Sequence, residues 1–179
     1  MKRAIIIIVS VLACNMIMQA QKPLVYDTII ERGIYTSYYN QLYNTASFVR
    51  YKLYKGGGSV KRKGLDFRQV VQGRIFKYSR SGYDKGHLAP AADFAHSRAE
   101  MAATFDYVNC LPQRPSLNRG EWKRDETMVR KWSQHDSLLI ECGGLDFDTM
   151  KNQVPAIFFK RVISLSTGDT LLNRQYQNK

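Results

Sequence analysis

The fold depends on one stretch near the middle of the chain, Tyr83-Asp84-Lys85-Gly86-His87-Leu88-Ala89-Pro90-Ala91-Ala92-Asp93-Phe94. Asp84 and Lys85 supply a hydrogen-bond acceptor and a cation, and His87 supplies an imidazole that titrates near neutral pH. Gly86 allows a tight turn or a close approach of the backbone, and Pro90 fits the first turn of a helix. The stretch therefore predicts a strand end that carries a histidine, followed by a short loop and a helix.

Two further polar motifs follow this stretch. A strand-like run from Phe105 to Leu111 ends at Pro112-Gln113, and Asn109 to Gln113 form an Asn-x-x-Pro-Gln arrangement. A helical pattern then runs from Ser116 to about His135. On a helix of 3.6 residues per turn, Asn118 and Glu126 fall on the same side. The pattern predicts a carboxamide and a carboxylate that project from one helix face, about two turns apart.

These residues suit phosphodiester hydrolysis, which requires deprotonation of a water molecule and stabilisation of the charge on phosphorus. His87 can take the proton, because its ordinary pKa lies near working pH. A divalent cation such as Mg²⁺ binds through few protein oxygens and keeps several waters. The Asn118 carbonyl is a suitable ligand, and Glu126 can accept hydrogen bonds from the waters of the metal. Lys85 and Arg62 are the cations expected to hold phosphate oxygens.

Taken together, the motifs resemble the signatures of the DNA/RNA non-specific endonucleases, a ββα-metal (His-Me finger) family that includes endonuclease G. The matching positions are Asp84, Gly86 and His87 with Leu88 to Phe94, then Asn109 with Pro112-Gln113, then Leu117-Asn118, Gly120, Trp122 and Glu126. The resemblance spans roughly residues 45–165. It departs from the family at Lys85, where the family usually has arginine. A lysine offers a point charge in place of a bidentate guanidinium.

The resemblance implies an α+β fold with an antiparallel sheet and a ββα-metal site, in which a strand bears His87 and a crossing helix bears Asn118. It implies His87 as general base and Asn118 as the main protein ligand of the metal. Glu126 then hydrogen-bonds the waters of the metal. The implied cofactor is Mg²⁺, with Mn²⁺ or another divalent cation as the alternative.

Three further roles follow from the same resemblance. An arginine before the histidine stretch helps to hold the scissile phosphate, and Arg62 is the better candidate, with Arg68 as the alternative. Asp84 is expected to orient the loop or an imidazole partner. Asn109 is expected to orient His87 or the backbone of the site.

The first twenty residues are predicted to form a signal peptide that is removed from a single domain, residues 21–179. Lys2 and Arg3 precede an apolar run, and Ala20 is a suitable cleavage point. The run is too short and interrupted for a comfortable membrane span, so no stable span is expected after cleavage. There are two alternatives to a cleaved signal peptide: an N-terminal membrane anchor that is retained, and a lipoprotein attached through Cys14. We expect a secreted or periplasmic protein.

The charge of the chain favours a polyanionic partner. The formal net charge is +12, and removal of Lys2 and Arg3 leaves +10. Such a surface suits the phosphate backbones of DNA and RNA. Two rivals stay open: an inactive or weakly active nucleic-acid-binding protein of the same fold, and a basic surface protein that binds polyanionic glycans. A homodimer is also left open.

Cys110 and Cys142 either form a disulfide or stay free as small buried apolar residues. We favour free thiols, because each lies in an apolar strand-like run.

Other elements follow from hydrophobic patterning. Strands are predicted over residues 48–54, 67–78, 105–111, 138–142 and 154–163, and a helix over 91–104. The tyrosine-rich residues 21–45 are expected to form an arm across the sheet, and Gly56 to Gly58 a flexible loop. The polar tail 173–179 is expected to fray.

Overall fold

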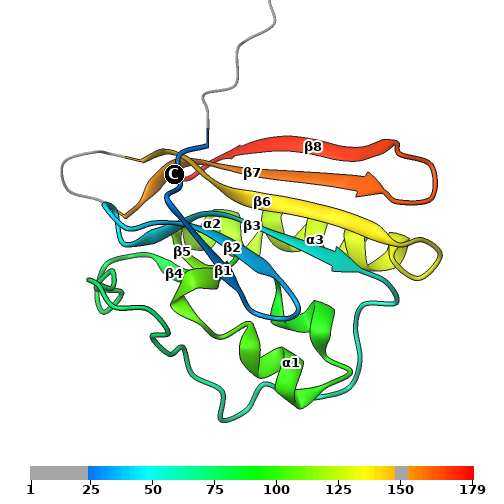
Figure 1. Cartoon of the computed structure of the whole chain (residues 1–179), viewed down its shortest axis with the longest axis horizontal. Helices are drawn as coiled ribbons and strands as arrows, with labels where there is room; N and C mark the ends of the chain where they lie inside the picture. Colours follow the sequence, from blue (N-terminus) through cyan, green and yellow to red (C-terminus); the bar gives the residue numbers. More distant parts are fainter. Residues whose placement is uncertain (1–23, 148–152) are drawn as a thin grey trace, which may run out of the picture.

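The computed structural model describes residues 24–147 and 153–179. Six antiparallel strands form one large sheet in the order β1-β2-β3-β6-β7-β8 (Figure 1). Their bounds are Thr28–Glu31, Thr36–Asn40, Thr45–Leu53, Leu138–Phe147, Pro155–Ser164 and Thr170–Gln177. A separate pair joins β4, Asp84–His87, to β5, Cys110–Gln113. The predicted α+β class with an antiparallel sheet is confirmed, as are the strands predicted over 48–54, 138–142 and 154–163.

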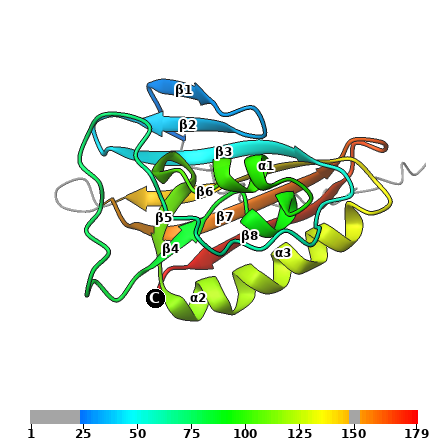
Figure 2. The same ribbon diagram turned by 90° about the horizontal axis from the view of Figure 1, so that it is seen from below.

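The helical elements lie on one face of the large sheet, together with the β4-β5 pair (Figure 2). They are the 3-10 helices η1, Ala91–Phe94, and η2, Tyr107–Asn109, and the α-helices α1, Arg98–Ala103, α2, Pro115–Arg119, and α3, Glu121–Trp132. The proposed catalytic residues therefore come from a layer that is packed beneath a broad sheet.

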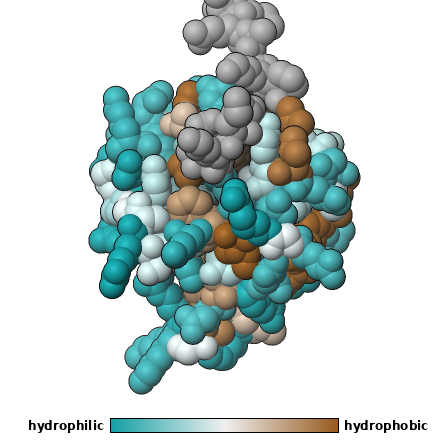
Figure 3. All heavy atoms as spheres, turned by 90° about the vertical axis from the view of Figure 1, so that its left-hand side faces the viewer, coloured by the Kyte–Doolittle hydropathy of each residue, from teal (hydrophilic) through white to brown (hydrophobic). Residues whose placement is uncertain are grey.

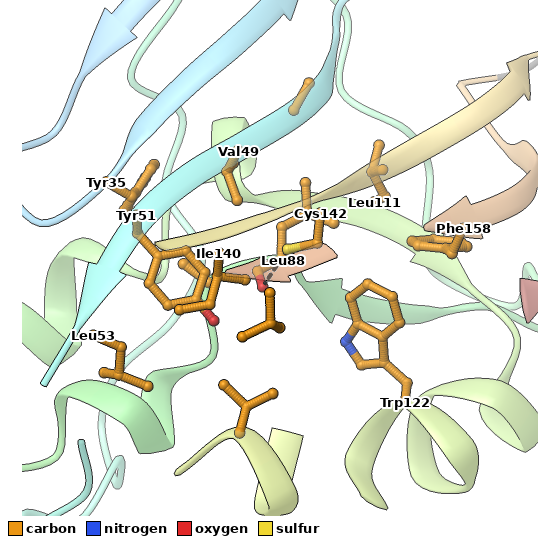
Figure 4. Packing of buried hydrophobic residues seen from close by; sticks show 14 of the residues in the cluster. Tyr35, Val49, Tyr51, Leu53, Leu88, Leu111, Trp122, Ile140, Cys142 and Phe158 are labelled. Carbon is orange, nitrogen blue, oxygen red and sulfur yellow. Dashed lines mark hydrogen bonds between the residues drawn. The ribbon is translucent and has the colours of Figure 1, made fainter. Parts of the chain in front are cut away.

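The core fills the space between the sheet and this layer. Alternate residues of β3, β6 and β7 point inward and are buried, as the two-residue period of a strand requires: Val49, Tyr51, Leu53, Leu138, Ile140, Cys142, Phe158 and Val162. From α3, Trp122 meets the rings of Phe158 and Tyr176 at centroid distances of 5.4 and 5.3 Å (Figure 4). Burial of each large apolar side chain stabilises the folded state by about 1.5–3 kcal/mol relative to its exposure to water. This packing therefore holds α3 against the sheet.

The β4-β5 pair depends on a glycine. His87 lies opposite Cys110, and Gly86 lies opposite Leu111. A Cβ atom on Gly86 would lie 2.5 Å from Oε1 of the buried Gln113. Any larger residue would force the two strands apart, so Gly86 is required by close packing at this point.

The helix predicted from Ser116 to His135 is divided in two. Gly120, with φ −101° and ψ −110°, separates α2 from α3. A side chain at Gly120 would collide with the carbonyl oxygen of Ser116. The single helix was therefore a wrong prediction, and Asn118 and Glu126 belong to different helices.

The helix predicted over residues 91–104 is also interrupted. It consists of η1 and α1, and Ser97 caps α1 by accepting a hydrogen bond from the Glu100 amide. The strand predicted over 105–111 is a short 3-10 helix, η2, followed by β5. In both places tertiary packing overrides the local pattern.

Three terminal and loop predictions are corrected. From residue 28 onward the tyrosine-rich segment does not form an arm across the sheet, because β1 and β2 pair as a hairpin at its edge. Residues 67–78 form a loop, with one isolated bridge from Arg68 to Asp106. The tail does not fray before residue 177, because β8 pairs with β7.

The glycine-rich loop is held in place on both sides. The Gly56 amide donates to the Ser133 hydroxyl at 3.1 Å, and the Gly57 amide donates to the Asp93 carbonyl at 3.0 Å. Gly58 has φ +129° and packs directly against the Ala95 backbone. The expectation of a flexible loop is not supported, because the Gly56 and Gly57 amides are hydrogen-bonded and Gly58 is packed against the Ala95 backbone.

Cys110 and Cys142 are free and buried, as we favoured. The Cys142 thiol donates to the Leu88 carbonyl at 3.1 Å (Figure 4), and Cys110 lies 3.2 Å from the Tyr78 hydroxyl. Burial raises the pKa of each thiol to about 12, so both stay protonated at neutral pH.

Among the described residues, no helix is long and apolar enough to cross a membrane. The predicted signal peptide, residues 1–20, and the lipid-attachment alternative at Cys14 lie outside the described residues.

Candidate active site

His87 stands at the end of β4, against two aromatic rings. The centroid of its imidazole lies 4.7 Å from the centroid of the Phe67 ring and 4.8 Å from that of the Phe105 ring. The side chain is half-buried, and within the described ranges its Nε2 atom has no hydrogen-bond partner. Burial, with the Arg62 charge as a smaller cause, lowers the pKa of His87 to about 3. The imidazole is therefore neutral at pH 7 and can accept a proton. Its Nε2 atom is buried.

Asn109 holds the backbone that follows His87. The Ala89 amide donates to its Oδ1 at 2.8 Å, while its Nδ2 donates to the carbonyls of Ala89 and Thr104 at 2.8 and 2.9 Å. No hydrogen bond joins it to the imidazole itself in the described structure. Of its two expected roles, the one directed at the site backbone fits these contacts.

Asn118 on α2 is joined to Asp84 on β4. Its Nδ2 donates to Asp84 Oδ2 at 2.9 Å. Arg119 donates to both oxygens of the same carboxylate, at 2.9 and 2.7 Å. The Arg119 contact, helped by Asn118, holds the pKa of Asp84 below its usual range. Since an ionised carboxylate only accepts hydrogen bonds, the Asn118 amide nitrogen must face Asp84, which leaves its carbonyl oxygen for another partner.

This arrangement changes the role expected for Asp84. Its carboxylate is occupied by Asn118 and Arg119, on the side of β4 opposite to His87. It does not contact an imidazole, and the expectation that it orients an imidazole partner is not supported. Its contacts instead orient the Asn118 amide.

The sequence matches a known family over most of its length. A family model of the DNA/RNA non-specific endonucleases matches residues 16–179. The chain belongs to this family. The predicted family is therefore confirmed.

Individual relatives agree with this assignment. Human mitochondrial endonuclease G is 32% identical over 142 residues, which are 66% of this chain and 48% of that protein. A nuclease from Nostoc sp. is 45% identical over 67 residues, 37% of this chain and 24% of that protein. The matches span about half or less of these relatives' own lengths.

A solved structure has the same fold. A chain of the EndoG/EndoGI complex superposes with a TM-score of 0.72 at 21% identity, covering 87% of this chain and 76% of that chain. With β4, β5 and the helices α2 and α3, the chain has the predicted ββα-metal fold.

Glu126 lies on α3, the helix that follows the one that carries Asn118. The side chain is half-buried on α3, between Lys160, Asp93 and Arg130. Burial raises the pKa of Glu126 to about 7, against the opposing influence of Lys160. Near neutral pH it is therefore part carboxylate and part acid.

Lys85 points to the same side of β4 as His87, among three aromatic rings. Its Nζ lies 5.3 Å from the Phe67 ring centroid, 5.4 Å from Tyr107 and 6.0 Å from Tyr78. The cation is exposed and is held near His87 by the shared ring of Phe67. An exposed cation–π contact contributes about 0.5–1 kcal/mol.

The two candidate arginines differ clearly in their surroundings. Arg68 is paired with the buried Asp106 at 2.6 Å. Arg62 is exposed and acts electrostatically on His87, and in the described ranges its side chain has no ion-pair partner. Arg98 donates to the carbonyls of Lys61 and Lys63 at 3.0 and 3.2 Å, and so braces the loop that carries Arg62. Arg62 is therefore the better placed for a phosphate.

Three residues near the site were not assigned from sequence. Gln113 is fully buried, and its amide has no partner among the described residues. Arg130 pairs with the buried Asp93 at 2.7 Å, and Lys160 is buried on β7. Arg130 lies four residues after Glu126, so helical spacing could have identified it. Lys160 belongs to the aromatic-Lys pair of the last predicted strand, but that local pattern does not show which residues surround it.

The donor set fits a hard divalent cation bound through few protein ligands. Within the described residues no three His, Cys, Asp or Glu side chains are grouped to hold a metal ion. The carbonyl oxygen of Asn118, freed by the bond from its amide to Asp84, is the oxygen donor that Mg²⁺ prefers.

Proposed function

We propose that this chain is a metal-dependent endonuclease that hydrolyses phosphodiester bonds in DNA and RNA with little sequence specificity. The observation that carries the proposal is the pairing of Asp84 with Asn118 beneath the strand that bears His87. The pairing orients the Asn118 amide on α2, and β4 also carries the neutral imidazole of His87, so both groups come from one ββα unit.

In this mechanism the His87 imidazole takes a proton from the attacking water. Arg62 and Lys85 hold phosphate oxygens by charge-assisted contacts. Asn118 would hold Mg²⁺, or Mn²⁺ or another divalent cation, and Glu126 would accept hydrogen bonds from its waters. The bound cation would offset negative charge and stabilise the leaving oxygen.

The cations also explain why little sequence specificity is expected. Contacts to phosphate give affinity without reading bases. The chain carries a formal net charge of +12, and the end of the molecule shown in Figure 3 is mostly hydrophilic, with smaller apolar patches. Phosphate contacts of this kind serve DNA and RNA alike.

Purified protein with Mg²⁺ tests the proposal. We expect it to cut plasmid DNA and RNA, and to stop when a chelator is added. His87→Ala and Asn118→Ala should abolish cleavage while nucleic-acid binding persists. His135→Ala and Asn173→Ala are matched controls at exposed positions and should retain activity. Folded wild-type protein that leaves both substrates intact would identify a binding protein instead.

Location and assembly complete the proposal. We propose that residues 1–20 direct export, so that the mature domain 21–179 is secreted or periplasmic. The N-terminal sequence of exported protein tests the cleavage point at Ala20, and lipid labelling tests the alternative at Cys14. A homodimer stays a prediction that sedimentation analysis can check.

A further inference from the structure

Lys160 is a buried cation without a direct ionic partner. It lies on the inner side of β7 and is 1% exposed, flanked by the fully buried Phe158 and Val162. In the ranges 24–147 and 153–179 no hydrogen bond or ion pair to its ammonium is found. Burial of an unpaired ammonium costs several kcal/mol, even after relaxation. Some nearby negative charge must therefore offset this cost.

The indole of Trp122 supplies only part of the compensation. The Lys160 Nζ lies 3.9 Å from the ring centroid, and Figure 4 shows this indole between α3 and Phe158. A desolvated cation–π contact contributes about 2 kcal/mol or more. That is less than the cost of burying the charge, so an anion is still required.

Two acids lie close enough to act on Lys160, and one of them is already paired. Asp93 accepts from Arg130 at 2.7 Å and from the Tyr51 hydroxyl at 3.0 Å. Glu126 makes no ion pair in the described structure, and Lys160 is the strongest positive charge that favours its carboxylate. Glu126 lies one helical turn after Trp122 on α3, so it is on the same helix face as the ring that contacts the Lys160 ammonium. Since Asp93 is paired with Arg130, Glu126 is the acid left to offset the charge of Lys160.

We propose that Lys160 is a positioning residue, whose buried ammonium is the counter-charge that favours the carboxylate form of Glu126 in the site. The inference rests on the proposed function, in which Glu126 accepts hydrogen bonds from metal-bound water. Without Lys160, Glu126 would be protonated at neutral pH and would be less suited to that role.

The other titratable groups around Glu126 do not replace Lys160. Arg130 is committed to Asp93. Burial raises the pKa of Tyr51 well above its usual range and that of Cys142 to about 12, so both are neutral at pH 7. Asp93 opposes ionisation of Glu126. Removal of the Lys160 charge should therefore change the ionisation of Glu126 more than removal of any of these other groups.

The test is a carboxyl-carbon NMR titration of Glu126 in metal-free protein, with the resonance assigned by its loss in Glu126→Gln. Lys160→Met should move the Glu126 midpoint upward by about one pH unit or more, the usual effect of one close opposite charge. Lys160→Arg should restore it. Arg161→Met removes an exposed cation from the next position of β7 and should leave it unchanged. An unchanged midpoint in folded Lys160→Met overturns the proposal.

A second measurement covers poor folding of Lys160→Met. Urea unfolding of Lys160→Met, Glu126→Gln and the double variant forms a double-mutant cycle. A double variant that is less destabilised than the two single changes together supports the pairing, and additive losses contradict it. Neither measurement uses nuclease activity. If the titration shifts as expected but the wild type does not cleave nucleic acid, the pairing stands and the proposed function fails.

Discussion

Asp84 and Asn118 lie 34 residues apart in the chain and are joined by a hydrogen bond of 2.9 Å. Asp84 is the first residue of β4, and Asn118 lies near the end of α2. Arg119 occupies both carboxylate oxygens as well. Because the carboxylate accepts only, the bond decides which end of the Asn118 amide faces outward. The strand thus determines the orientation of the helix residue that we propose as metal ligand.

Asp84→Ala should lower kcat about 10–100-fold, the usual cost of removing a partner that orients a metal ligand. It should also weaken binding of Mn²⁺, measured by calorimetry or by electron paramagnetic resonance. Asp169→Ala, at an exposed position in the loop between β7 and β8, is the matched control. Wild-type kcat and Mn²⁺ affinity in Asp84→Ala would show that the Asp84–Asn118 bond has no orienting role.

His87 should give the protein a distinctive acid sensitivity. Its pKa is about 3 when folded and about 6.5 when unfolded. Between these values the unfolded chain binds a proton that the native state does not, so the free energy of unfolding falls as pH falls. This contribution is complete above about pH 6.5 and is lost progressively toward pH 3.

Urea unfolding of wild type and His87→Gln between pH 3.5 and 8 measures this effect. The glutamine variant should lose less stability on acidification, because it lacks the titrating imidazole. His135→Gln removes an exposed histidine and should follow the wild-type curve. Parallel curves for wild type and His87→Gln would contradict a depressed pKa at His87.

The sequence predicts correctly the elements that depend on local spacing. The strand that ends at His87 follows from a short motif, and the strands of the core follow from alternating apolar residues. The separation of α2 from α3 was missed, because a lone glycine within a helical pattern is usually tolerated. Only the backbone at Gly120 shows that the helix cannot continue there.

The remaining errors arise from contacts between distant residues. Ser37 is a polar residue on β2, yet it is fully buried, because its hydroxyl donates to the Val108 carbonyl. Val70 and Val71 pack against the core from a loop, although their composition favours a strand. Such outcomes depend on partners that a single segment does not contain, and the roles of Asp84 and Lys160 are hidden for the same reason.

Variants of Lys85 can show whether a lysine binds phosphate at the position where the family usually has arginine. We expect Lys85→Met to lower kcat/KM about 10-fold or more, the value of one charge-assisted hydrogen bond to phosphate. Its removal should also reduce, by about one, the slope of the logarithm of the binding constant against the logarithm of the salt concentration. Lys85→Arg keeps the charge and should retain most activity, if the guanidinium fits among Phe67, Tyr78 and Tyr107.

Lys77→Met is the control for Lys85, because it removes an exposed cation from the nearby loop. It should change kcat/KM by much less than Lys85→Met does. Equal losses in the two variants would mean that Lys85 acts only through the net charge of the surface.

Arg98 should affect substrate binding through the loop that it braces. It donates to the carbonyls of Lys61 and Lys63, on either side of Arg62. Arg98→Leu removes both bonds and frees the loop, so Arg62 would lose part of its fixed position. We expect KM to rise several-fold, about 1 kcal/mol for the lost hydrogen bonding, with a smaller change in kcat. Arg124→Leu, on the exposed side of α3, controls for lost charge.

A double variant shows whether Arg98 acts through Arg62. Arg98→Leu combined with Arg62→Leu should have a KM no higher than that of Arg62→Leu alone, because Arg98 acts by holding the loop that carries Arg62. Additive losses in KM would instead mean that Arg98 contacts the nucleic acid directly.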